Sequence, residues 1–122
     1  MIDAASFRNV RLNGGFVIAE VQFTREPLVD ALGREAAAQT RIVGKEIRLL
    51  IRASLDEQES SITLYHEILE AASVASVHPP SSVAEFNAGD FERTARDMHE
   101  KLGEVTPEKL NDMLQSFGFR EE

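Results

Sequence analysis

One short stretch of the chain contains side chains that can bind a metal ion, His66-Glu67-Ile68-Leu69-Glu70. His66 and Glu70 are four residues apart, so on a helix they lie on the same face, one turn from each other. Zinc accepts imidazole nitrogen and carboxylate oxygen at roughly 2 Å, and catalytic zinc sites commonly use three protein ligands and a water. A carboxylate at Glu67, beside the first ligand, would be placed to take a proton from that water.

This spacing resembles the zincin metallopeptidase signature His-Glu-x-x-His, with Glu70 where the family has its second histidine. The resemblance implies that His66 and Glu70 bind zinc and that Glu67 is the catalytic general base. A metal-activated water would then attack a polarised carbonyl. The glutamate in place of histidine makes the site more anionic than a typical peptidase site and leaves both the identity of the metal and the activity open.

The resemblance also concerns the elements on either side of the motif. Small zincin domains place an edge strand shortly before the motif helix, which is the position of Glu46 to Ala53 here. In gluzincin-like members a third, acidic ligand comes from the following helix. The resemblance therefore implies Glu85 as the third ligand, with Asp90 and His78 as alternatives.

Helical signals surround the motif and continue to the end of the chain. Ser61 is a good N-cap for a helix over residues 62–77, which His78-Pro79-Pro80 must end because proline removes a backbone donor. A second helix is expected from Ser82 or Asp90 to Leu102, with Gly103 as its C-terminal cap. A third is expected from Thr106-Pro107 to near Gly118, with apolar side chains at helical spacing, Leu110, Met113, Leu114 and Phe117.

Strand signals fill the first half of the chain. The turn residues Asn13-Gly14-Gly15 predict a hairpin within residues 6–23, and residues 26–44 give conflicting signals and stay ambiguous. Residues 46–53 alternate, with Ile47, Leu49 and Ile51 on one face. Strands followed by helices predict an α+β fold, in which three helices pack on one face of a small antiparallel or mixed sheet. The resemblance of the motif to that of zincins implies that this fold is zincin-like.

Composition limits the classes of function. A chain of 122 residues is expected to form a single domain, residues 1–122. Its net charge of -8 and the lack of a basic patch argue against nucleic acid as a partner, because phosphates would repel it. The sequence has no cysteine, no predicted signal peptide and no apolar stretch that could span a bilayer, which favours the cytoplasm and no membrane partner.

The leading prediction is a zinc-dependent hydrolase of the peptidase type, with a peptide or protein substrate. The alternative is a non-catalytic interaction or regulatory module with a zincin-like fold. On a plainer interpretation the motif lies on a solvated helix, where Glu67 and Glu70 face water while the core stripe consists of apolar residues, Leu64, Ile68, Leu69 and Ala72. Tyr65 either packs or stabilises an oxyanion. The substrate and the oligomeric state stay open.

Overall fold

The computed structural model describes residues 2–30 and 32–119, and its sheet contains four strands in the order β1-β2-β4-β3. These are β1 (Val10–Arg11), β2 (Val17–Thr24), β3 (Ala38–Val43) and β4 (Glu46–Arg52). β2 runs parallel to β4, and the other neighbouring pairs are antiparallel. The sheet is therefore mixed, and β3 forms one of its edges. The resemblance to zincins implies that residues 46–53 form the edge strand; this is wrong, because β4 lies between β2 and β3.

The predicted hairpin near the N-terminus is confirmed, with a shorter first arm than the sequence indicates. Gly14 and Gly15 adopt φ of 89° and 80°, a backbone conformation that residues with a Cβ rarely take, and they turn the chain between β1 and β2. Part of the expected first arm is instead a 3₁₀ helix, η1 (Ala4–Phe7), whose Phe7 side chain is buried.

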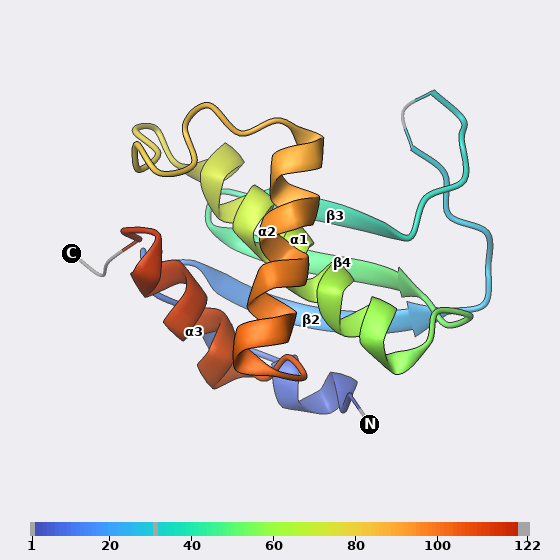
Figure 1. Cartoon of the computed structure of the whole chain (residues 1–122). Helices are drawn as coiled ribbons and strands as arrows, with labels where there is room; N and C mark the ends of the chain where they lie inside the picture. Colours follow the sequence, from blue (N-terminus) through green and yellow to red (C-terminus); the bar gives the residue numbers. More distant parts are fainter. Residues whose placement is uncertain (1, 31, 120–122) are drawn as a thin grey trace.

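The alternation of residues 46–53 is confirmed as β4, since Ile47, Leu49 and Ile51 are buried on one face. The ambiguous stretch before it divides into two parts. Residues 25–30 and 32–37 form an irregular arm that projects from the sheet (Figure 1), and β3 follows it. Gly33 has a φ of 77°, a conformation that glycine adopts readily and that a helix does not contain.

The motif lies on α1 (Glu57–Ala75), which begins earlier than predicted. The N-cap is Asp56, whose carboxylate accepts the backbone N–H of Glu59 at 2.7 Å, so the prediction of Ser61 as the cap is wrong. Asp56 is an equally good capping residue. The acidic side chains of the first turn, Glu57 and Glu59, stabilise the helix because they lie near the positive end of its dipole. The helix ends before His78, as the prolines require.

Ser61 instead lies inside α1, fully buried, and links two parts of the fold. The backbone N–H of Val105 donates to its hydroxyl oxygen at 2.9 Å, and Nδ1 of His99 lies 2.8 Å from the same oxygen. The hydroxyl thus ties α1 to the end of α2 and to the connection that follows it.

Ser61→Ala should lower the free energy of unfolding by about 1–3 kcal/mol, because it leaves the buried N–H of Val105 without a partner. Urea denaturation monitored by circular dichroism measures this change. Ser73→Ala is the matched control, since the Ser73 hydroxyl only donates to the carbonyl of Leu69 in the same helix. A loss no larger than that of the control would contradict a bridging role for Ser61.

The second helix, α2 (Ala88–Leu102), starts between the two positions that the sequence offers. Asn87 is its N-cap, and Asp90 completes a capping box by accepting the backbone N–H of Asn87 at 2.9 Å. Gly103 ends the helix with a φ of 86°, which confirms its predicted role.

The third helix, α3 (Pro107–Ser116), is confirmed with Thr106 as its N-cap. Its side chains Leu110, Met113 and Leu114 are buried, as their spacing predicts. Tyr65 of α1 is also buried and donates its hydroxyl proton to the carbonyl of Gly103, so it packs rather than facing a site.

The helices gather on one side of the sheet (Figure 1). α1 packs against β3 and β4, and both α2 and α3 pack against α1. Buried apolar side chains of the sheet and all three helices form one cluster. The α+β class, with a mixed sheet and the helices on one face, is thus confirmed, while the zincin-like fold stays a prediction. None of the helices in the described part of the chain is long and apolar enough to cross a bilayer.

Candidate functional site

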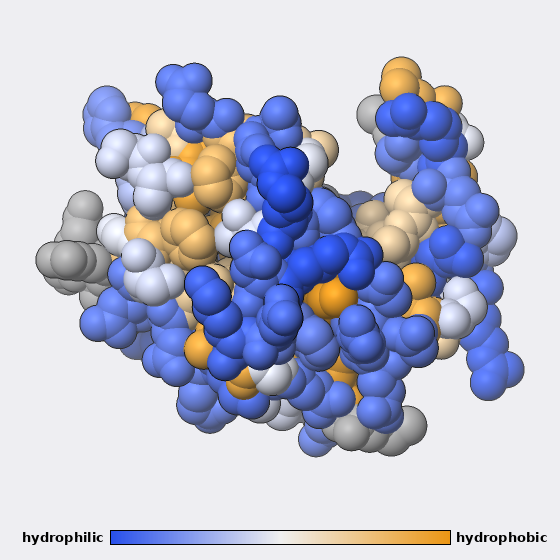
Figure 2. Space-filling view, in the orientation of Figure 1, coloured by the Kyte–Doolittle hydropathy of each residue, from blue (hydrophilic) through white to orange (hydrophobic). Residues whose placement is uncertain are grey.

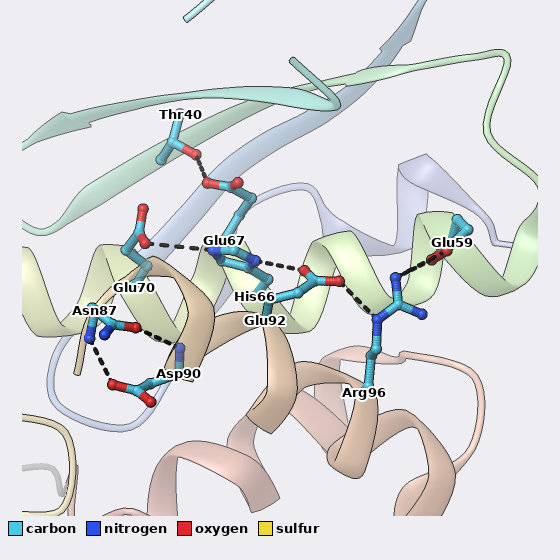
Figure 3. Close-up of polar contacts among 9 residues, drawn as sticks. All are labelled: Thr40, Glu59, His66, Glu67, Glu70, Asn87, Asp90, Glu92 and Arg96. Atoms are coloured by element: carbon cyan, nitrogen blue, oxygen red, sulfur yellow. Dashed lines mark hydrogen bonds and ion pairs between the residues drawn. The ribbon is translucent and has the colours of Figure 1, made fainter. Parts of the chain in front are cut away.

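His66 lies on the side of α1 that faces α2, with its ring between two carboxylates (Figure 3). Nδ1 lies 2.9 Å from Oε1 of Glu92, and Nε2 lies 3.4 Å from Oε2 of Glu70. The ring also stacks on Phe91, with centroids 6.2 Å apart. These contacts fix the orientation of the imidazole, and they confirm that His66 and Glu70 share one face of the helix.

Glu92 was not singled out in the sequence, and it is the acidic side chain that reaches the imidazole from α2. It follows the buried Phe91, at the border of the apolar stripe of α2. Nε of Arg96 donates to Oε2 of Glu92 at 2.9 Å, and the same guanidinium contacts Glu59 of α1 at 3.1 Å. A row of ion pairs thus crosses the interface between α1 and α2. The i, i+4 spacing of Glu92 and Arg96 is the only signal of it in the sequence.

Glu67 points toward the sheet and away from the α2 side of His66 (Figure 3). The hydroxyl of Thr40 on β3 donates to its carboxylate at 2.7 Å. The apolar residues of the predicted core stripe are buried, which confirms that part of the plain interpretation: Leu64, Ile68, Leu69 and Ala72. The same interpretation places Glu67 in water, which is wrong, because this side chain is half-buried where α1 faces the edge strand β3.

The surroundings shift the pKa values of both motif residues. Burial alone would lower the pKa of His66, but hydrogen bonds to Glu70 and Glu92 and the charge of Glu67 outweigh it and raise the pKa to about 9. Burial raises the pKa of Glu67, and the hydrogen bond from Thr40 offsets part of that rise. The site therefore favours a positive charge at the imidazole.

Stability should fall with pH as His66 loses its proton. The folded pKa of about 9 exceeds the ordinary value of 6.5, so the contribution is complete below pH 6.5 and is lost as pH rises through about 9. Because the carboxylate partners are partly exposed, the loss should be about 1–2 kcal/mol. Urea denaturation at several pH values, with EDTA present, measures it. His66→Gln should remove this step, and an unchanged step in the variant would assign it to another group.

The other candidate ligands lie elsewhere. Glu85 is exposed in the turn before α2, because that helix begins only at Ala88. Asp90 is engaged in the capping box and in an ion pair with Arg93, and His78 is exposed beyond the end of α1. Across residues 2–30 and 32–119, no group of three or more His, Asp and Glu side chains is arranged to hold a metal ion. The structure thus joins His66 and Glu70 and leaves Glu85 apart.

Comparison with known proteins adds no relative from which a role could be taken. No family model, curated protein or solved structure matches this chain. The resemblance to zincins thus rests on the five motif residues and their helix, and the role of the site follows from its chemistry and geometry.

The pair formed by His66 and Glu70 has the spacing of two ligands of one ion. With zinc bonds of roughly 2.0–2.1 Å and a tetrahedral angle, two ligand atoms lie roughly 3.4 Å apart. Nε2 of His66 and Oε2 of Glu70 are 3.4 Å apart. A charge-assisted hydrogen bond between such groups is commonly shorter, about 2.7–2.9 Å. The same two atoms also form an ion pair at this distance, and the described residues supply no third ligand at this position.

Proposed function

We propose that the chain is a zinc-dependent hydrolase of the peptidase type, in which His66 and Glu70 hold the ion. The observation that carries the proposal is the 3.4 Å separation of Nε2 and Oε2 on one helical face. Imidazole nitrogen and carboxylate oxygen are both ordinary zinc ligands. Zinc at this position would lower the pKa of a coordinated water and polarise a carbonyl group.

Glu67 would be the general base of the proposed reaction. Its carboxylate is near enough to His66 and Glu70 for their charges to affect its pKa. Burial raises that pKa, which brings it closer to the neutral range where a base is most effective. The hydrogen bond from Thr40 keeps the side chain in place at the edge strand. Glu67 would accept a proton at one of its carboxylate oxygens.

The position of the edge strand supports a peptide as substrate. β3 is the last strand of the sheet, and its Thr40 contacts Glu67 directly. An extended peptide can add to such an edge through backbone hydrogen bonds. A cavity of about 500 Å³ lies beside this strand and the arm, but Gln39, Arg48 and Leu50 line it on the face of the sheet opposite α1, so it does not reach Glu67. Figure 2 shows a hollow between the arm and the body of the molecule.

Zinc stoichiometry tests the proposal. Purified protein, dialysed at neutral pH after addition of excess zinc, should retain one zinc per chain by elemental analysis. His66→Ala should lose this zinc, because only Glu70 would remain as a ligand. His78→Ala is the matched control and should keep it, since His78 is exposed and apart from the site. A wild-type protein that retains no zinc would contradict the proposal.

The alternative is a non-catalytic module, and one observation favours it. A protonated His66 already forms ion pairs with Glu70 and Glu92, and these pairs join α1 to α2 without any ion. On this alternative the histidine is a structural cation. Wild-type protein would then bind no zinc, and His66→Ala would weaken the contact between the two helices.

A further inference from the structure

The two ring nitrogens of His66 have different partners at different distances (Figure 3). Nδ1 lies 2.9 Å from Oε1 of Glu92, which is the length of a charge-assisted hydrogen bond. Nε2 lies 3.4 Å from Oε2 of Glu70, a longer contact. Glu92 and Glu70 therefore stand on opposite sides of the ring and do not converge on one ion.

Both oxygens of Glu92 are in use. Oε1 contacts the imidazole, and Oε2 accepts a hydrogen bond from Nε of Arg96 at 2.9 Å. The guanidinium of Arg96 is in turn held by the carboxylate of Glu59, at 3.1 and 3.3 Å. Arg96 thus holds the Glu92 carboxylate in place, and Glu92 could bind an ion at Nε2 only by losing its contacts with both His66 and Arg96.

We propose that Glu92 is a positioning residue, which accepts the Nδ1–H of His66 and so directs Nε2 toward Glu70. In metal sites, a histidine ligand commonly donates its second ring N–H to a carboxylate, which fixes both the tautomer and the orientation of the ring. Arg96 completes the arrangement by holding the carboxylate. The link to zinc rests on the proposed function, whereas the orientation of the ring does not.

The tautomer of His66 tests this role without metal. ¹⁵N NMR of labelled, metal-free protein at a pH above the pKa of about 9 reports which ring nitrogen keeps its proton. Wild-type protein should show the proton on Nδ1. Glu92→Met should shift it toward Nε2, because the acceptor at Nδ1 is gone. A wild-type ring protonated on Nε2, or a tautomer unchanged in Glu92→Met, would overturn the proposal.

Zinc affinity distinguishes a positioning residue from a ligand. Competition with a chelating dye should show a loss of about 10–100-fold in Glu92→Met, the usual effect of removing an outer hydrogen-bond partner. Glu92→Gln should lose much less, because its amide oxygen still accepts the Nδ1–H. Equal losses in both variants would make Glu92 a ligand and overturn the proposal, as would no loss in either.

Arg96→Met should weaken zinc binding about tenfold, because Glu92 loses its support. Arg93→Met is the matched control on the same helix and should change nothing, since Arg93 pairs with Asp90. Equal effects of the two substitutions would overturn the role of Arg96. A wild-type protein without zinc would overturn the proposed function alone, since the tautomer of His66 still decides whether Glu92 positions the ring.

Discussion

Glu67→Gln is expected to reduce the rate of hydrolysis by a factor of about 10²–10⁴ and to leave zinc affinity nearly unchanged. Glutamine has the same shape as glutamate, and its amide oxygen can still accept the hydroxyl proton of Thr40. It cannot accept the proton that a general base must remove from water. Cleavage of a mixed peptide library, followed by mass spectrometry, measures the rate, and dye competition measures the zinc affinity.

Glu100→Gln is the control for this experiment, because it makes the same change at an exposed position of α2. It should keep both the activity and the affinity for zinc. Two results would contradict the role given to Glu67. Unchanged hydrolysis would show that it is not the base, and a large loss of zinc would make it a ligand.

Zinc affinity should fall about tenfold for each pH unit below the pKa of His66, because a proton must leave Nε2 before zinc can bind. Burial lowers that pKa, but the contacts to Glu70 and Glu92 raise it by more, so it is about 9. Between pH 8.5 and 6.5 the expected loss is therefore about 100-fold. An unperturbed histidine would lose little over the same range, because its pKa lies near 6.5.

Isothermal titration calorimetry measures this dependence directly. Titrations with zinc in buffers of different ionisation enthalpy should show close to one proton released per zinc bound at pH 7. The carboxylates that raise the pKa of His66 are thus also what makes zinc binding depend strongly on pH. If the zinc affinity did not change over this pH range, or if no proton were released, zinc would not displace a proton from this imidazole.

The fold was largely predictable where local signals are strong. The alternation of β4, the prolines after α1 and the glycine after α2 all lie where the sequence indicates them. The start of α1 was not predictable, because the acidic and polar residues of its first turn are also typical of a loop. Asp56 and Ser61 are both good caps, and only tertiary packing shows that Ser61 must be inside the helix.

The site was predictable only within α1. The spacing of His66 and Glu70 follows from helical periodicity, and the structure confirms that their side chains meet. Thr40 could not be found, because the stretch before β4 gave conflicting signals and its pairing with β4 is set by tertiary contacts. Glu92 was missed because the start of α2, and hence the face it turns to α1, depends on the capping box that begins at Asn87.

The most direct test of the account is a crystal structure of the protein grown with zinc, with anomalous diffraction recorded at the zinc absorption edge. If His66 and Glu70 bind zinc, an anomalous peak should lie roughly 2 Å from Nε2 of His66 and from a carboxylate oxygen of Glu70. Glu92 should remain on Nδ1. A peak at another position, or His66 still held between two carboxylates with no peak beside it, would contradict the account.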